Sequence, residues 1–315
     1  MVEPSTPASI RNVLLGASAG RPYLAGRRGK SRLAHVGCLL AAICFAIGLA
    51  ARQSDAGIAK IGPVGKLDAA YRATLLGFPI GQITWTVDVR DKSFSATATG
   101  ATAGLLLIFA RGHGVAEAHG SFAGKQMEPA NFAVNYSHGS SSEEIRIAFS
   151  GGKAREYLAP PPRPNPNVIP LTDGFRDGVV DPMTALIVPV PGTGDLPTAA
   201  GCNRTIPVFD GRMRYDMGLT FKRIEQVKAD VGYEGPAVVC GISFAPLAGY
   251  DPTRYAIKYL QAERGMELWL APLTGTRLMV PFRVSVPTPI GVGILQATRF
   301  DWTHQGAGSP PTRSN

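Results

Sequence analysis

Residues 82–89 read Gln-Ile-Thr-Trp-Thr-Val-Asp-Val, and this stretch decides the fold. Apolar side chains at Ile83, Trp85, Val87 and Val89 alternate with polar side chains at the even positions. Successive side chains of a β-strand point to opposite faces of the sheet. The alternation therefore predicts a strand with one buried face.

The same pattern recurs along the chain, in residues 132–136, 145–149 and 278–286. Turn-forming sequences separate these runs, at Gly77-Phe78-Pro79, Gly151-Gly152, Asp210-Gly211 and residues 232–236. Many short strands between turns are typical of an antiparallel sheet that curls upon itself. We therefore predict an all-β, mainly antiparallel fold, either a strongly curved sheet or a partly open barrel or sandwich.

One short helix is expected near residues 182–188. Asp181 can accept hydrogen bonds from free backbone N–H groups, and Pro182 suits the first helical position. Residues 183–188 would form about two turns, and the Pro191-Gly192 pair would end them.

Residues 1–56 have the features of an export signal. Basic residues precede an apolar stretch at 33–51 that is rich in alanine and glycine, and small residues follow it. We expect cleavage between Ala51 and Gly57 after export to the periplasm by the general secretory route. The alternative is an inner-membrane anchor formed by residues 33–51, because about 18 to 20 apolar residues can cross a bilayer.

Removal of this signal changes the charge of the protein. The remaining chain has 25 basic and 21 acidic residues, so its net charge is +4, whereas the full chain carries +9. It contains no block of five or more like charges. Nucleic-acid binding needs a stronger basic footprint, so we expect no nucleic-acid partner.

The cysteines divide between the signal and the rest of the chain. Cys38 and Cys44 lie in the signal, which leaves Cys202 and Cys240 in the exported protein. Two cysteines in an oxidising compartment predict a disulfide bond. Two buried free thiols are the alternative.

No residue is predicted to be catalytic, to bind a cofactor or to ligate a metal. Glu117 and His119 would share one face of a strand, but a solvated strand face explains them more simply. His113 would lie about 20 Å from His119 on an extended strand, too far for both to hold one ion. Absence of a paired nucleophile and base lowers the prior for an enzyme.

Five segments together resemble the exported proteobacterial proteins grouped as domain-of-unknown-function family 3108: residues 71–81, 181–186, 202–216, 233–240 and 267–272. The Phe209-Asp210-Gly211-Arg212 and Tyr233-Glu234-Gly235-Pro236 segments are the more specific ones. The resemblance implies export and β-structure and supplies no catalytic residue.

The resemblance also bears on the domain organisation. Residues 159–170 are rich in proline and could form either a linker or a surface loop. Since the resemblance extends across this segment, it implies one β-rich domain over 57–305 with a proline-rich loop at 159–170. Residues 306–315, rich in Gly, Ser and Pro, are expected to form a disordered tail.

The Phe209-Asp210-Gly211-Arg212 segment has two interpretations. Asp-Gly at the tip of a hairpin favours a turn. Alternatively, Asp210, Arg212 and Arg214 could hold an anionic ligand. We favour the turn, because exposed turn charges are usually solvated.

Three hypotheses for function remain. The first is a non-catalytic periplasmic protein that binds a lipid-like or hydrophobic envelope component on the concave face of its sheet, where Ile83, Trp85, Val87 and Trp269 are the candidate ligand-facing residues. The second is an envelope assembly or scaffold protein that binds partner proteins through sheet edges. The third is a hydrolase with a non-standard site, for which Glu117 with His119 would be the starting pair.

Overall fold

The computed structural model describes residues 64–103, 112–123, 126–160 and 164–304. The expected export signal at 1–56 and the expected tail at 306–315 lie outside the described residues. Within the described part, no helix has both the length and the hydropathy needed to cross a membrane.

Strands dominate the described residues and join into one 15-stranded sheet, with antiparallel pairing between all neighbours in the main path. The main path runs β7-β6-β5-β4-β3-β2-β1-β15-β14-β13-β12-β10-β9, while β11 pairs with β15 and β8 pairs with β14. The strands are β1 (Gly65–Leu75), β2 (Phe78–Val89), β3 (Ser93–Thr102), β4 (Gly112–Ala123), β5 (Gln126–His138), β6 (Ser141–Ser150), β7 (Lys153–Leu158), β8 (Val188–Pro189), β9 (Arg204–Phe209), β10 (Arg214–Lys228), β11 (Val231–Gly232), β12 (Glu234–Ala248), β13 (Glu267–Pro272), β14 (Leu278–Thr288) and β15 (Gly291–His304). The predicted all-β, antiparallel fold class is confirmed.

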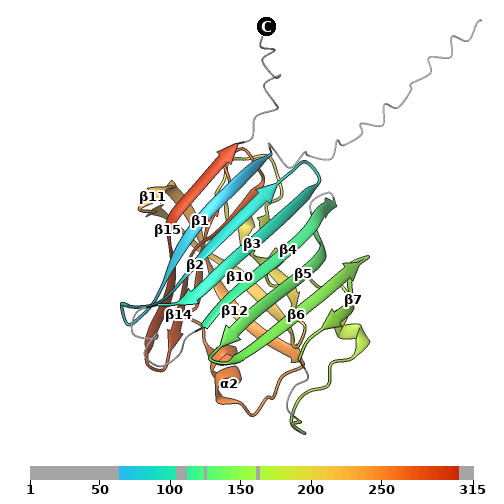
Figure 1. Cartoon of the computed structure of the whole chain (residues 1–315). Helices are drawn as coiled ribbons and strands as arrows, with labels where there is room; N and C mark the ends of the chain where they lie inside the picture. Colours follow the sequence, from blue (N-terminus) through green and yellow to red (C-terminus); the bar gives the residue numbers. More distant parts are fainter. Residues whose placement is uncertain (1–63, 104–111, 124–125, 161–163, 305–315) are drawn as a thin grey trace, which may run out of the picture. The chain divides into compact units, whose positions relative to one another are not determined.

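The stretch at 82–89 forms the second half of β2 and behaves as its alternation predicts. Trp85, Val87 and Val89 are buried, whereas Gln82 and Thr84 are exposed on the other face. In the sheet, β2 lies between β1 and β3 (Figure 1). The buried face of this half of the sheet therefore points into the curl.

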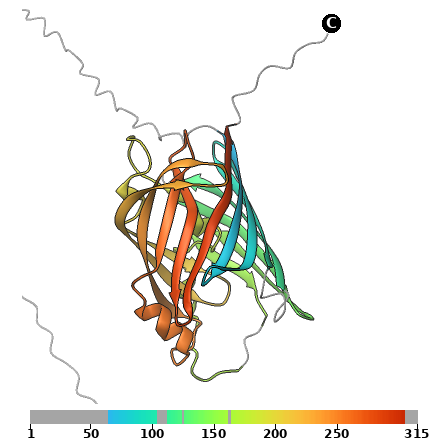
Figure 2. The same ribbon diagram turned by 90° about the vertical axis from the view of Figure 1, so that its left-hand side faces the viewer.

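The sheet curls into a barrel (Figure 2). Its two edge strands, β7 and β9, meet where Tyr157 contacts Phe209. Residues 177–180 bridge this seam. The N–H of Gly178 donates to the carbonyl of Gly152 at the start of β7 (2.7 Å), and Val180 exchanges hydrogen bonds with Pro207 and Phe209 of β9 (both 2.9 Å). The barrel is thus closed at the seam by a short connecting segment and not by pairing between β7 and β9.

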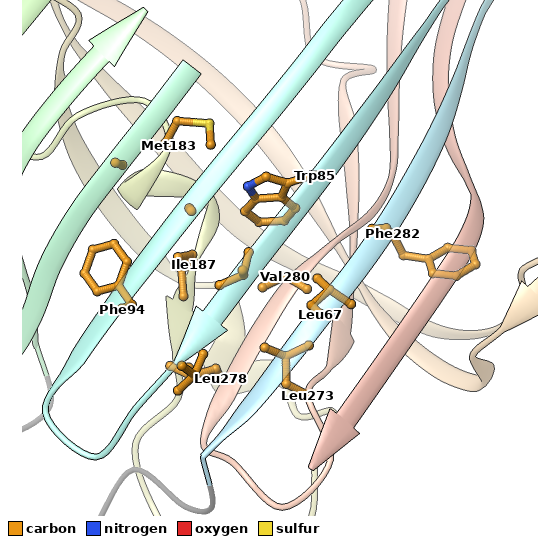
Figure 3. Close-up of a cluster of buried hydrophobic side chains, with 14 of the residues drawn as sticks. Leu67, Trp85, Phe94, Met183, Ile187, Leu273, Leu278, Val280 and Phe282 are labelled. Atoms are coloured by element: carbon orange, nitrogen blue, oxygen red, sulfur yellow. The ribbon is translucent and has the colours of Figure 1, made fainter. Parts of the chain in front are cut away.

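The interior of the barrel holds a segment of the chain as well as side chains of the strands. Val179, Met183 and Ile187 pack in the same buried cluster as Leu67 of β1 and Trp85 of β2. Figure 3 shows Met183 and Ile187 facing the inner surface of the sheet. Residues 179–187, which we call the inner segment, therefore fill the concave face.

The expected helix near 182–188 forms only a 3-10 turn, η2 (Thr184–Leu186). Asp181 accepts hydrogen bonds from the N–H groups of Met183 and Thr184, as predicted for a capping residue (both 2.9 Å). The backbone becomes extended at Ile187, because Val188 then pairs with Met279 of β14. Strand pairing thus ends the helical turn early.

Three further helical segments connect the strands in the described part of the chain. Two are short 3-10 turns, η1 (Asp173–Arg176) and η3 (Ala199–Gly201), and one is the α-helix α2 (Tyr255–Ala262). No helix was predicted at α2, and its start has a weak signal, since the side chain of Arg254 does not cap it. The described residues of the proline-rich loop at 159–170 form no strand or helix.

The disulfide predicted between Cys202 and Cys240 is present, with a Cα–Cα distance of 5.6 Å. Cys240 lies on the face of β12 that points away from the barrel interior, and Cys202 follows η3. Around the bond, Val188, Val190, Leu268 and other side chains form a second buried cluster. Residues 188–202 therefore cover the outside of β12 and β13.

Candidate functional site

The predicted ligand-facing residues lie on the concave face, where protein atoms already surround them. Trp85 and Val87 are buried in the main cluster, and Ile83 packs against it. The inner segment occupies the adjacent space (Figure 3). The indole N–H of Trp85 is nevertheless buried without a hydrogen-bond partner among the described residues. A buried donor of this kind costs about 1 to 3 kcal/mol if nothing accepts its proton.

The inner segment also carries a buried carboxyl group. Asp181 is fully buried, and its second oxygen accepts a hydrogen bond from the hydroxyl of Thr184 (2.5 Å). Burial raises the pKa of Asp181, although its hydrogen bonds with Thr184 and Met183 oppose the rise. Since the neighbours on its own turn satisfy both oxygens, Asp181 stabilises the inner segment and is not aimed at a ligand.

Trp269 is buried in the same main cluster and contacts two guanidinium groups. The Arg283 and Arg223 groups lie 4.8 Å and 5.6 Å from its ring, and its indole N–H donates to Glu225 (2.6 Å). Arg223 also binds Glu267 through two hydrogen bonds, and this contact lowers the pKa of Glu267 to about 2. The ring is thus held by cation–π contacts within a salt-bridge network.

The outer face of β4, β5, β6 and β7 contains an open groove of about 720 Å³. Its lining combines polar and apolar groups and includes three carboxylates, at Glu117, Glu144 and Glu156. Arg146 binds Glu144 at 2.5 Å, which leaves the other two carboxylates without a cation in the lining. The groove is therefore acidic.

Glu117 and His119 both line this groove as exposed neighbours on β4. The structure confirms that they share a face, but no hydrogen bond within the described residues joins them. No group of three or more potential metal ligands occurs in the described part of the chain. His113 is exposed on the same strand and does not line the groove.

At one side the groove ends on the edge strand β7. Residues Arg155 to Leu158 are exposed, and beyond Lys153 no other described segment forms backbone hydrogen bonds with the outer edge of β7. The ring of Tyr157 contacts Phe209 across the seam (5.4 Å between centroids). An unpaired edge beside an acidic groove can bind an extended chain.

Comparison with protein families identifies the chain. The family described as "Protein of unknown function (DUF3108)" matches residues 70–298, most of the sequence. The chain belongs to this family. No curated protein matches it.

Among solved structures, the chain is similar to a β-barrel-like protein of domain of unknown function DUF1849 from Brucella abortus. The two share 8% sequence identity with a TM-score of 0.41, over 76% of this chain and 98% of that chain.

The Phe209-Asp210-Gly211-Arg212 segment of this DUF3108 protein forms the predicted hairpin turn between β9 and β10. Asp210 accepts hydrogen bonds from the N–H groups of Arg212 and Met213 (2.8 and 2.7 Å), so its carboxylate closes the turn. Gly211 has φ of +93°, and a Cβ there would lie 2.5 Å from Ile145 of β6. Only glycine therefore fits this position.

The arginine of the same segment makes a contact across the barrel. Arg212 donates to Glu143 of β6 (2.5 Å), which also accepts a hydrogen bond from Tyr136 of β5. Arg214, the other candidate anion ligand, pairs with Asp216 at 2.7 Å. Asp210, Arg212 and Arg214 therefore each interact with other groups of the protein. These contacts favour the turn interpretation over an anion site.

Sequence reasoning missed the unpaired edge of β7 and the acidic groove beside it. The groove joins residues from four strands, and the edge depends on where the curl of the sheet stops. The sequence feature that could have indicated the edge is the charged pair Arg155-Glu156, which lies shortly before the proline-rich loop.

Proposed function

We propose that this protein is a non-catalytic, periplasmic component of the cell envelope that binds an extended partner chain along the edge of β7. The observation that carries the proposal is the unpaired edge at 155–158, which borders an open groove of about 720 Å³ that could receive side chains. Strand addition would supply backbone hydrogen bonds, and the groove would select side chains.

The chemistry of the groove specifies the partner. Glu117 and Glu156 lack a cation in the lining, and Leu158 and Tyr157 provide exposed apolar surface beside them. An extended segment that alternates basic and apolar residues would match both features, since alternate side chains of a strand face the same side. The expected partner is therefore a basic, β-forming segment.

Two observations support the periplasmic location. Disulfide bonds persist in oxidising compartments, and Cys202–Cys240 uses both cysteines that follow residue 56. The sequence of residues 1–56 has the pattern of an export signal. Amino-terminal sequencing of protein from the periplasmic fraction tests this expectation, and full-length chain in the inner membrane would show that 33–51 is an anchor.

A peptide of alternating lysine and valine tests the edge proposal. We expect it to bind the protein and to protect the backbone amides of 155–158 from hydrogen exchange, whereas a glutamate–valine peptide should not bind. Leu158→Lys should reduce binding by about tenfold or more, because charge on an edge opposes strand addition. Val115→Lys is the matched control, since Val115 is exposed on the outer face of β4 outside the groove. Equal effects of the two substitutions would contradict the proposal.

The unpartnered indole N–H of Trp85 favours a second candidate function, the binding of a lipid-like molecule on the concave face. A ligand carboxylate or ester could accept this hydrogen bond, but the ligand would have to displace the inner segment. Adding a long-chain fatty acid should then change the tryptophan fluorescence of the wild-type protein, and Trp85→Phe should remove that change. A signal that is absent, or that persists in Trp85→Phe, would leave this candidate without support.

A further inference from the structure

Two neighbouring hairpins expose apolar side chains at the same end of the barrel. Leu76 and Phe78 of the β1–β2 hairpin are 62% and 58% exposed, and Ile290 of the β14–β15 hairpin is 67% exposed. The hairpins touch, because the N–H of Leu76 donates to the carbonyl of Val292 (3.3 Å). Val292 is itself 43% exposed, and we call Leu76, Phe78, Ile290 and Val292 the apolar rim.

The β1–β2 turn places a leucine where the backbone disfavours one. Leu76 has φ of +53° and Gly77 has φ of +81°, a combination for which asparagine and glycine are the usual residues. A branched side chain in this region is uncommon. The Leu76 side chain lies against Gly291 of the neighbouring hairpin, where a Cβ would clash with it, but most of Leu76 stays exposed. A strained, exposed apolar residue suggests a role outside the folding of the domain.

The helix α2 lies at the same end of the barrel (Figure 1). Its link to the rim is close, since a Cβ at Gly265 would lie 3.0 Å from Pro287, which pairs with Val292. Tyr255 is 70% exposed. None of the residues of α2 is buried.

The charge of this helix is positive. Lys258 is the only charged residue of α2, and the exposed Arg254 precedes it directly. The flanking carboxylates offset part of this charge, so residues 251–264 carry a net charge of +1, from three cations (Arg254, Lys258, Arg264) and two anions (Asp251, Glu263). The hydrogen bonds of both carboxylates are made within the protein. Asp251 accepts hydrogen bonds from Thr253 and Asn165, and Glu263 accepts one from the N–H of Gly265.

We propose that this end of the barrel binds the surface of a phospholipid bilayer that contains anionic lipids. The apolar side chains project from the ends of two hairpins. Such protruding side chains can insert into the acyl region of a bilayer, which needs no preformed pocket on a partner. Tyrosine rings and flanking cations are the groups that favour the interface between lipid headgroups and acyl chains. Anionic headgroups complement Arg254 and Lys258. The proposal is independent of the β7 edge, which lies elsewhere on the barrel.

Vesicle co-sedimentation tests this proposal. Protein purified from the cell fraction where it accumulates is mixed with vesicles of phosphatidylcholine alone or of phosphatidylcholine and phosphatidylglycerol in equal parts. We expect binding to the mixed vesicles and a loss of about tenfold or more in the triple variant Leu76→Ser, Phe78→Ser, Ile290→Ser. Arg254→Glu with Lys258→Glu should weaken binding to the mixed vesicles only.

The matched control is Phe221→Ser, Ile224→Ser, Val231→Ser, which removes three exposed apolar side chains on β10 and β11, outside the two rim hairpins, and should bind as wild type does. Near-ultraviolet circular dichroism verifies that each variant is folded. Equal binding by wild type and the rim variant, or equal loss in the two triple variants, would overturn the proposal. Sedimentation velocity gives a third outcome: a dimer that the rim variant converts to monomer, with unchanged vesicle binding, would assign the rim to a second copy of the chain and overturn the proposal.

Discussion

The two halves of the sheet bury their strands in different ways. In β1 to β6, one face contacts the core and the other faces solvent, so buried and accessible residues alternate. In β13 and the first part of β14, nearly every residue is buried, because residues 188–202 cover the outer face. The half that gains this cover also contains the disulfide. Stability is therefore expected to concentrate there, while the first half keeps an outer surface free for contacts.

The largest expected effect comes from removing the disulfide. Replacing both cysteines in Cys202→Ser, Cys240→Ser should lower the free energy of unfolding by about 4 kcal/mol, given the 38-residue separation. Chemical denaturation measures the loss. Hydrogen exchange should accelerate in residues 188–202 and β12, with little change in β2 and β3. Uniform acceleration of exchange across both halves would contradict the view that stability is concentrated in the second half.

Polar substitution of an outer-face residue tests whether the cover formed by residues 188–202 stabilises the second half. Leu270→Ser, in β13, should cost about 3 to 4 kcal/mol, because Leu270 is fully buried in the outer cluster. Thr97→Ser, on the outer face of β3, should change stability by less than about 0.5 kcal/mol. Comparable costs in thermal or urea unfolding would show that the two outer faces are equivalent.

The inner segment contacts both halves, and Asp181 reports on it. Asp181→Ala should cost about 1 to 3 kcal/mol, because it leaves the amides of Met183 and Thr184 without an acceptor. Asp181→Asn keeps an acceptor oxygen and should cost less.

The same residue predicts a pH dependence. Burial raises the pKa of Asp181 in the folded state, so the folded protein binds a proton more readily than the unfolded chain. Its contribution to stability is therefore greatest at low pH and is lost as the pH rises through the folded-state value. Urea unfolding should show that the stability of the wild type, relative to that of Asp181→Asn, falls as the pH rises through this value.

The smallest loss expected in the second half belongs to the salt-bridge network around Trp269. The pKa of Glu267 is lowered to about 2, so its contribution is present above the ordinary value and is lost as the pH falls towards 2. Because Arg223 is partly exposed, Glu267→Gln should cost only about 0.5 to 1 kcal/mol at neutral pH. A loss as large as that of Leu270→Ser would mean that charge, and not apolar cover, stabilises the second half.

The same contrast explains how much of the fold could be predicted from the sequence. Ile83 to Val89 alternate because one face meets water, and that pattern alone predicts the strand and its buried side. Leu268 to Ala271 are buried on both faces, so no alternation remains to indicate a cover. The disulfide followed from the count of cysteines and the expected compartment.

The parts of the site that escaped prediction depend on tertiary contacts. Residues 184–186 have helical signals at Asp181-Pro182, but the pairing of Val188 with Met279 limits them to one 3-10 turn. Trp85 was predicted to face a ligand, and it faces the interior, but only the fold shows that the inner segment lies there. The unpaired edge of β7 exists because the bridge at 177–180 reaches only its first residues.

Neighbours in the main path of the sheet follow one another along the chain, with two exceptions. The short β11 lies between β10 and β12 in the sequence, and β1 pairs with β15, which places Gly65 opposite His304. The start of β1 and the end of β15 therefore lie side by side. A short linker between these two ends and new termini within residues 159–170 would give a circular permutant that keeps every strand pairing. In the natural chain, residues 159–203 connect β7 to β9 across the seam. In the permutant this connection would be cut, and both chain termini would lie near the seam.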